Sequence, residues 1–448
     1  MTIGTIDKPL TRSQLLVRMN WAAGFAAAFA AITLTSLNRY GQALHLTPFA
    51  FGVLAALPFL TAFAQIPASY LVERWGHRKP VAIFGILTHR ALWLAIAAVP
   101  WVVPRAWWWL GLLAFVGLTN TFAHLGTPAT TSWAADLVPW RLRGRYYALR
   151  GQLVRIINVP VCLVLGWALD RATRQGAHAL LLALSIILAL AALLGMVDSL
   201  LCLKLPDRWH RPRTAGLPFW EILLRPLADR NFRFFLGYNG FITLATGFVT
   251  PFVWLYLTEV VKLGNATAIF MTMVGTSVVS LFSMRLWGTL VDRWGCRRVL
   301  LVAGLLIING ASVWAFVTPS TLWTGYLLVL ISSLGWPGME LATSNLLYSM
   351  SESGRGGERL GSAYAALNSA VVAVMGTLSG LLGGGIAELL KDWSYPVGEW
   401  RLTYHVVLFV ISGLLRIVAL AWVLGLRDDG RRAPRPVDAR RLPSSLSS

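Results

Sequence analysis

Two related stretches of eleven residues decide the fold: SYLVERWGHRK at residues 69–79 and GTLVDRWGCRR at residues 288–298. A shift of 219 positions superimposes them, and the same shift places Asn20 on Asn239 and Phe51 on Phe270. A shorter match, Leu-Gly-x-Pro, recurs at residues 125–128 and 334–337. Repetition over half a chain indicates two equivalent structural units. The sequence therefore predicts a protein made of two similar halves.

The composition places both halves in a lipid bilayer. Of the 448 residues, 56% are hydrophobic and only 13% are charged, whereas soluble domains carry roughly 25% charged residues. Apolar runs of about 20 residues predict helices that cross the bilayer, because a helix satisfies its own backbone hydrogen bonds in lipid. Twelve such helices are expected, at residues 17–38, 49–72, 81–100, 107–129, 148–169, 179–203, 234–257, 267–290, 299–317, 322–347, 362–390 and 401–426.

Polar segments divide the chain into four parts. We expect a first six-helix bundle over residues 1–203, a Pro- and Arg-rich cytoplasmic linker over 204–233 and a second six-helix bundle over 234–426. The tail from 427 to 448 is rich in Arg, Pro and Ser and is predicted to be disordered. The expected fold class is therefore an all-α integral membrane protein with twelve transmembrane helices in two pseudo-symmetric bundles.

The net charge of +20 is a signal of membrane topology. If the N-terminus is cytoplasmic, 28 of the 39 Lys and Arg residues fall in cytoplasmic segments and seven on the opposite side. This bias follows the positive-inside rule. We therefore expect an integral protein of the bacterial inner membrane with both termini in the cytoplasm, surrounded by lipid and without a nucleic-acid partner.

No motif in the sequence indicates an enzyme. The patterns HExxH, CxxC and Gly-x-Ser-x-Gly are absent, and the three cysteines are scattered without metal-ligand spacing. A nucleotide-binding P-loop is also absent, so the energy for transport has to come from an ion gradient or from the gradient of the solute itself. We expect no metal, no cofactor and a monomer.

The two repeated turns resemble the signature of the major facilitator superfamily. The family carries such a turn between its second and third helices and again between its eighth and ninth helices, where the two copies fall here. The first copy departs from the pattern, because Ser69 replaces a glycine and Glu73 replaces an aspartate. The resemblance extends from about residue 15 to residue 426 and implies two bundles that rock about a central site.

The resemblance also implies a gate at these turns. Their glycines allow close helix contact, and their carboxylates can face the positive end of a helix in the opposite half. In the family this cluster stabilises the state closed to the cytoplasm; a basic turn that only sets topology is the alternative. The loop at residues 136–145 resembles another family element and offers a partner for Asp292. The expected gating residues are Glu73, Arg74, Gly76, Arg78, Gly288, Asp292, Arg293, Gly295, Arg297 and Arg143.

Charged residues inside apolar spans indicate either function or pairing. Each costs about 2.5–3.5 kcal/mol at the centre of the bilayer. Arg90 and Asp198 fall on helices that the resemblance places on the outside of the bundle, so we expect a structural ion pair. Arg416 is expected to neutralise Glu340 in a similar way.

Polar residues on the central helices supply the candidate substrate site. Arg155, with Asn158 one turn later, is expected to bind an anionic or polyhydroxylated solute; packing is the alternative. Glu340 is the candidate proton-coupling carboxylate, because burial favours the protonated form of a carboxyl group; a structural carboxylate is the alternative. His124 is interpreted either as a proton shuttle or as a buried structural histidine. The other candidates for substrate contact or helix–helix hydrogen bonding are Asn20, Asn239, Asn368 and Trp336.

These features predict a secondary transporter that moves a small polar solute by alternating access, with coupling to protons. A sugar or an organic anion is favoured as the substrate. The alternatives are a transporter-derived sensor or scaffold without flux, and an exporter of drugs or metabolites.

Overall fold

The computed structural model describes residues 12–69, 78–137, 143–203, 205–206, 224–314, 317–318, 320–353, 361–397 and 400–427. The first half consists of long helices joined by short turns. These elements are α1 (Arg12–Ala43), α2 (Pro48–Thr61), the 3-10 turn η1 (Ala62–Ala64), α4 (Arg78–Val102), the 3-10 turn η2 (Arg105–Trp107), α5 (Trp108–Leu137), α6 (Arg143–Arg174) and α7 (Ala177–Leu203).

The second half is also helical but less regular. Two of its segments, η5 and η6, are π-helical turns, and a short antiparallel hairpin, β1–β2, precedes the last helix. Its elements are η4 (Arg225–Ala228), α9 (Arg230–Gly247), α10 (Thr250–Leu255), η5 (Tyr256–Val260), α11 (Asn265–Ile269), η6 (Phe270–Val274), α12 (Gly275–Trp294), α13 (Cys296–Val313), α14 (Leu322–Ser353), α15 (Gly361–Leu389), β1 (Ser394–Val397), β2 (Trp400–Thr403) and α16 (Tyr404–Leu424).

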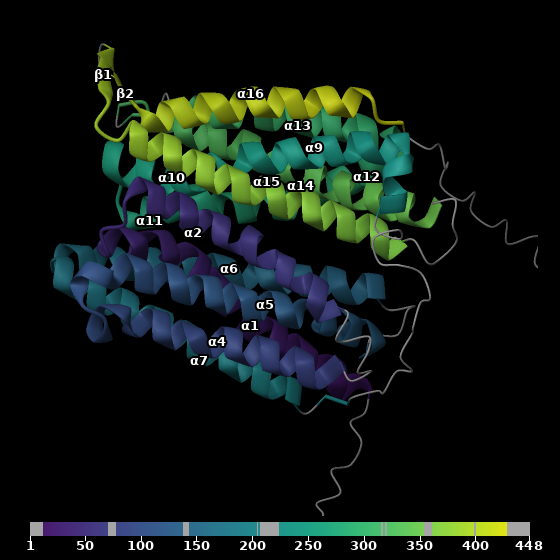
Figure 1. Cartoon of the computed structure of the whole chain (residues 1–448), viewed down its shortest axis with the longest axis horizontal. Coiled ribbons are helices and arrows are strands. Elements are labelled where there is room, and N and C mark those ends of the chain that lie inside the picture. Colours follow the sequence, from purple (N-terminus) through teal and green to yellow (C-terminus); the bar gives the residue numbers. More distant parts are fainter. Residues whose placement is uncertain are drawn as a thin grey trace, which may run out of the picture.

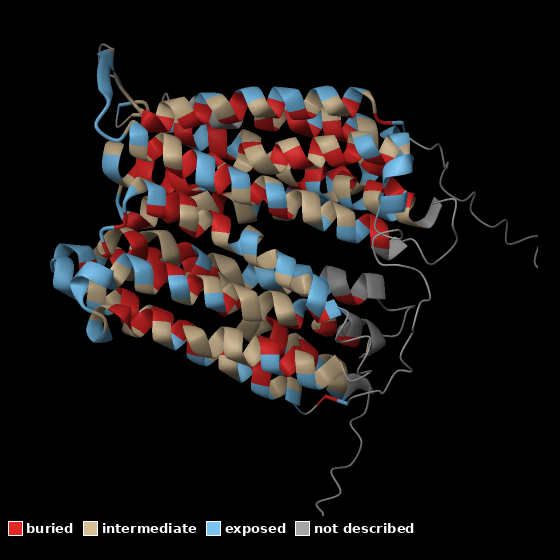
Figure 2. Ribbon diagram, in the orientation of Figure 1, coloured by how far each residue is buried: buried red, intermediate tan, exposed pale blue. Residues whose placement is uncertain are grey.

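The helices have the length and surface of membrane-spanning segments. Ten described segments are long and apolar enough to cross a bilayer, and α13 and α14 occupy the positions of the ninth and tenth predicted spans. Exposed positions lie along the outward sides of the helices (Figure 2), and many of them carry large apolar side chains; Phe282 is 79% exposed and Trp167 is 64% exposed. Such a surface requires lipid around it. The predicted all-α membrane fold is therefore confirmed.

Figure 1 shows the helices in two groups, with α1 to α7 in one group and α9 to α16 in the other. We call the end at which α7 ends and α9 begins the linker end. The opposite end, at which α1 ends and α2 begins, is called the closed end because a buried core joins the two halves there.

The sequence repeat reappears in the contacts at the linker end. The Lys79 ammonium donates a hydrogen bond to the Leu205 carbonyl at 2.7 Å, and the Arg297 guanidinium donates to the Leu424 carbonyl at 2.7 Å. Leu205 and Leu424 are themselves 219 positions apart. The shift of 219 aligns Lys79 with Arg298 and Arg78 with Arg297, so the two donors occupy neighbouring positions of the repeat. In each half, a basic residue of the repeated turn holds the carbonyl end of the last helix of that half, where a cation is favourable.

The ion pair predicted between Arg90 and Asp198 is confirmed. The two side chains meet at 3.3 Å between α4 and α7, and the guanidinium also lies 3.8 Å from the centre of the Phe29 ring. The pair predicted between Arg416 and Glu340 is wrong. Arg416 is buried and donates to the Ile307 carbonyl at 2.7 Å, whereas Glu340 is exposed.

Candidate functional site

The buried core shows how the two halves meet. One cluster of buried apolar residues runs across both halves at the closed end and includes Tyr40, Phe51, Phe252 and Phe409. Toward the linker end the clusters separate. One lies in the first half around Trp133, and the other lies wholly in the second half. The halves are therefore joined through apolar packing at the closed end.

One face of α6 forms a seam with the second half. Arg155, Asn158, Cys162, Gly166 and Asp170 follow at intervals of three or four residues and so share this face. The Asn158 amide donates to a serine hydroxyl of α12, Ser277, at 3.0 Å. A β-carbon on Gly166 would lie 2.7 Å from the α-carbon of Ala266, so only glycine allows this close approach.

Asp170 is the residue of this seam that lies nearest the closed end, and its carboxylate contacts the second half. One oxygen, Oδ1, accepts from the backbone N–H of Asn265 at 2.6 Å and from its side-chain amide at 3.0 Å. The other oxygen, Oδ2, accepts from the backbone N–H of Ala266 at 3.1 Å. Hydrogen bonds to a charged acceptor are the strong class, so this carboxylate is a firm link between α6 and α11.

Gln42, near the end of α1, is a second polar link. Its amide nitrogen donates to the Thr258 hydroxyl at 2.8 Å and to the Glu259 carboxylate at 2.9 Å. Its amide oxygen accepts from the indole N–H of Trp254 at 2.9 Å. Neither Gln42 nor Asp170 could be singled out from the sequence, because polar residues at the ends of membrane helices are common.

On the other side of the molecule, glycines join α2 to α15. A β-carbon on Gly384 would lie 2.8 Å from the α-carbon of Gly52, and one on Gly380 would lie 2.8 Å from the β-carbon of Ala56. Small residues at such spacing allow helix backbones to touch in a membrane. The closed end is thus held by a polar seam and by a glycine seam.

The predicted gating residues at the linker end are only partly described. Glu73, Arg74 and Gly76 lie outside the described residues, and so does the side chain of Arg143. Asp292 and Arg293 are exposed, and neither forms an ion pair with a described residue.

The other residues of the second turn have structural surroundings that can be stated. A β-carbon on Gly288 would meet nothing within 4 Å, so the close helix contact expected there is not made in this conformation. Gly295 ends α12 with a φ of 83°, which favours glycine. Arg297 holds the end of α16 as described above, and its first-half counterpart, Arg78, begins α4.

A polar stripe on α5 surrounds His124. Asn120, His124, Thr127 and Thr131 share one side of the helix, and the two threonines are exposed. His124 donates from Nε2 to the Pro58 carbonyl at 2.8 Å and accepts at Nδ1 from the Gln65 amide at 2.7 Å. Both ring nitrogens are therefore used, with the proton assigned to Nε2 by these partners.

The 3-10 turn that follows α2 explains why the Pro58 carbonyl is available to His124. The N–H of Ala62 bonds to the Phe59 carbonyl, because the helix tightens into η1 at that point. In a regular α-helix the same N–H would bond to the carbonyl of Pro58. The freed carbonyl accepts the imidazole N–H instead.

A second polar stripe lies on α14, the helix equivalent to α5. The exposed side of α14 is apolar near the closed end, at Trp323 and Leu330, and polar near the linker end, at Glu340, Ser344 and Asn345. Polar groups are costly in contact with lipid tails. The expectation that Glu340 is buried is therefore wrong, and its side of α14 has the character of a water-facing surface.

The structure brings two of the predicted asparagines together. The Asn239 amide donates to the Asn368 carbonyl oxygen at 2.6 Å, which links α9 to α15 within the second half. Trp336 lies 6.0 Å from the guanidinium of Arg416 and belongs to the same packed region. Asn20 stands apart from these residues, in the first half.

Arg155 is the cation on the face of α6 that meets the second half. Its guanidinium lies 3.9 Å from the Met284 sulfur of α12. It forms no ion pair with a described residue, and the side chain is only half-buried. An unpaired guanidinium at the junction of the halves is available to a ligand anion or hydroxyl group.

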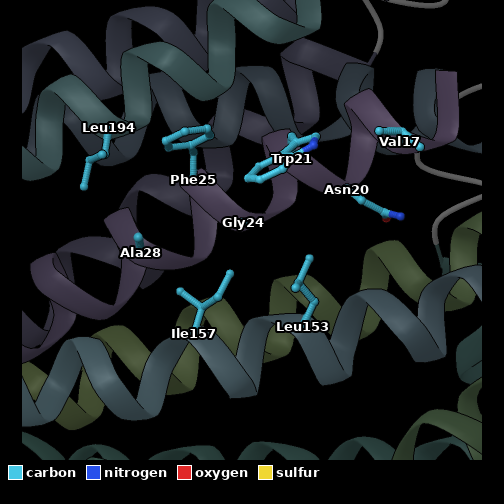
Figure 3. A pocket seen from close by; sticks show the side chains of 9 residues that line it. All are labelled: Val17, Asn20, Trp21, Gly24, Phe25, Ala28, Leu153, Ile157 and Leu194. Carbon is cyan, nitrogen blue, oxygen red and sulfur yellow. The ribbon is translucent and has the colours of Figure 1, made fainter. Parts of the chain in front are cut away.

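An apolar pocket of 440 Å³ lies between α1, α6 and α7, wholly within the first half. Figure 3 shows its residues on these helices, and none of the lining residues belongs to the polar stripes on α5 and α14. The pocket includes Asn20, but the Oδ1 atom of that side chain is buried without a described partner. The lining residues are Val17, Asn20, Trp21, Gly24, Phe25, Ala28, Leu153, Ile157 and Leu194.

The comparisons with known proteins agree with this architecture. The model of the Major Facilitator Superfamily matches residues 19–380. A mutant of the nucleoside transporter NupG shares the fold with a TM-score of 0.68 and 15% identity, over 92% of this chain and all of that one. No curated protein matches the sequence.

Two further solved structures have the same fold. A D-xylose–proton symporter has a TM-score of 0.64 at 16% identity, over 92% of this chain and 97% of that one. A bacterial homologue of the iron transporter ferroportin, in an inward-facing state, has a TM-score of 0.63 at 14% identity, over 92% and 98%.

Two packed helical halves with polar stripes on equivalent helices define a membrane transporter. The chain belongs to the Major Facilitator Superfamily. It is a secondary transporter and not an enzyme, as the predictions from the sequence stated.

Proposed function

We propose that the chain moves a small polar solute across the bacterial inner membrane by alternating access, with the linker end facing the cytoplasm. The observation that carries this proposal is the contrast between the two ends. A continuous buried core joins the halves at the closed end, while polar stripes on α5 and α14 are exposed toward the linker end. Water has to reach these stripes from the linker end, which corresponds to a state open to the cytoplasm.

The side chain of Arg155 supports the proposal that the substrate accepts hydrogen bonds and is either an organic anion or a sugar. The guanidinium has five N–H donors, and the contact with Met284 leaves most of them available. A carboxylate or a pair of hydroxyl groups fits this donor set. The nucleoside and D-xylose transporters of similar fold carry solutes with hydroxyl groups, which is consistent with this class.

Glu340 supports coupling to protons. It is the exposed carboxylate of the polar stripe on α14, and it forms no ion pair with a described residue. A carboxylate that meets water in one state and protein in the other changes its affinity for a proton between the two states. That difference is what couples a proton gradient to movement of the halves.

The experiment is solute uptake into proteoliposomes of the purified protein, with D-xylose, uridine and succinate as labelled probes. We expect accumulation of one probe when the proton concentration is higher on the entry side. Glu340→Gln should lose this accumulation and keep exchange of labelled for unlabelled solute. Asp392→Asn, which removes an exposed carboxylate at the closed end, is the matched control and should behave as the wild type.

The outcomes separate the proposal from its alternatives. Binding of a probe without flux would favour a sensor or scaffold. Flux that is outward under every gradient would favour an exporter. Full proton-driven accumulation by Glu340→Gln would overturn the assignment of the coupling residue.

A further inference from the structure

We infer that the carboxylate of Asp170 keeps the closed end shut, because it holds the corner formed by residues 250–274 against α6. Release of these hydrogen bonds opens the closed end, and we therefore call Asp170 the latch. This inference rests on the proposed alternating access and names the residue that sets the balance between the two states. Three observations carry it.

The first observation is the number and kind of bonds that Asp170 makes across the halves. It accepts three hydrogen bonds from Asn265 and Ala266 at 2.6–3.1 Å, and the Asn265 amide also reaches the Thr173 hydroxyl at 3.1 Å. Gly264 lies so close that its β-carbon would be 3.3 Å from the carboxylate. Each of these contacts joins α6 of one half to residues 264–266 of the other.

The second observation is the placement of charge around the latch. Arg39 of α1 lies near Asp170 of its own half and Glu259 of the opposite half, without an ion pair to either carboxylate among the described residues. Its Nη1 donates to the Gln42 oxygen at 3.2 Å, while Gln42 in turn binds Glu259 at 2.9 Å. Arg39, Gln42 and Glu259 therefore form one chain of hydrogen bonds across the halves, which separation of the halves would break.

The third observation is the irregular backbone of the corner that Asp170 holds. Residues 250–274 contain the π-turns η5 and η6, and Lys262 between them has a φ of 59°. The equivalent corner of the first half, between α1 and α2, also has one residue with positive φ, His45 at 58°, but it carries no π-turn. π-turns occur mostly as single turns inside α-helices, frequently at functional sites. We therefore assign the movement to the corner of the second half.

The seam on α6 supplies a natural reporter of this movement. Cys162 lies on the same face as Asp170 and is fully buried, with its sulfur 3.4 Å from the Asn158 amide oxygen and 3.6 Å from the Thr35 hydroxyl. When the corner leaves α6, water reaches this face from the closed end. The thiol then becomes available to a reagent.

The test measures alkylation of Cys162 by a charged maleimide in protein embedded in nanodiscs. Cys202→Ser and Cys296→Ser leave Cys162 as the single cysteine. Asp170→Asn replaces an acceptor by an NH2 group that faces the backbone N–H donors, so it should raise the alkylation rate about tenfold or more. Asp392→Asn carries the same change of charge at the same end and should leave the rate unchanged.

A second reporter distinguishes opening of the latch from general unfolding. Ser344→Cys, in a background with Cys162→Ser, places a thiol on the exposed stripe at the linker end. In the Asp170→Asn variant this thiol should react more slowly, because opening of the closed end closes the linker end. Asp170→Glu keeps the negative charge, so the alkylation rates of both reporter thiols should return part of the way to their wild-type values.

Two outcomes would overturn the latch. In the first, Cys162 reacts at the wild-type rate in Asp170→Asn. In the second, both reporters become faster together. If a probe is still transported in either case, the proposed transport function stands and only the role of Asp170 is wrong. If the alkylation rates at both ends never change and no probe is transported, the proposed function itself is contradicted.

Discussion

The backbones of Gly52 and Gly384 touch across the two halves, since a β-carbon on Gly384 would lie 2.8 Å from the α-carbon of Gly52. Real β-carbons essentially never come that close to another atom, so the closed end as described is compatible only with very small residues at this point. The contact of α2 and α15 at the closed end therefore depends on two glycines.

Gly384→Ala should shift the protein away from the described state. The added methyl group forces α2 and α15 apart at the closed end, and overpacking of this kind costs roughly 1–3 kcal/mol. We expect slower alkylation of Ser344→Cys at the linker end. Gly385→Ala is the matched control, because its β-carbon would meet nothing within 4 Å. Equal rates in the two variants would show that the glycine contact does not hold the closed end.

Asp198→Asn should destabilise the first half strongly. It leaves the Arg90 guanidinium buried without its carboxylate, and removal of one partner of a buried ion pair costs about 3–5 kcal/mol. The measurement is thermal unfolding of the purified protein. Arg90→Met combined with Asp198→Leu should recover most of the loss, because no charge then remains buried. A double variant that unfolds as early as Asp198→Asn would contradict this reading of the pair.

Arg416→Met should behave differently from Asp198→Asn. The Arg416 side chain is 5% exposed and donates to the Ile307 carbonyl, but it forms no ion pair with a described residue. Its replacement leaves no carboxylate unpaired, so stability should change by no more than about 1 kcal/mol in either direction. Thermal unfolding measures this as well. A loss as large as that of Asp198→Asn would indicate that Arg416 does pair with an acid.

Arg155→Gln should weaken transport without weakening the fold. Loss of a guanidinium that contacts the substrate costs about 1.5–3 kcal/mol, so the KM of the transported probe should rise about tenfold or more. Arg171→Gln removes an exposed arginine from the same helix and should leave the KM unchanged. An unaltered KM in Arg155→Gln, with uptake intact, would remove Arg155 from the substrate site.

Much of the fold could be predicted from the sequence. Long apolar runs gave the approximate positions of the helices, because bilayer thickness and backbone hydrogen bonding leave few alternatives. The repeated turns indicated two similar halves, and in each half a basic residue of the turn, Lys79 or Arg297, holds the end of the last helix. The partner of Arg90 was predictable because a buried charge requires an opposite one.

The docking of the halves could not be predicted in the same way. Asp170 and Asn265 are 95 positions apart and lie at helix ends, where nothing in their spacing pairs them. The exposure of Glu340 depends on which end is closed, which is a property of the conformation. The π-turns η5 and η6 leave no signal in the hydrophobic pattern, because one extra residue in a turn is smaller than the uncertainty of a helix boundary.

The most direct test of the account is solute flux with the closed end locked. The side chains of Gln42 and Thr258 meet across the halves at the closed end, with the amide nitrogen 2.8 Å from the hydroxyl oxygen. In a background free of other cysteines, Gln42→Cys with Thr258→Cys should therefore be joined by a short bis-methanethiosulfonate reagent, which cross-links the halves. We predict that the cross-linked protein carries no D-xylose, uridine or succinate, and that reduction restores uptake of the transported probe. Undiminished uptake while the cross-link is complete would contradict alternating access between the two halves.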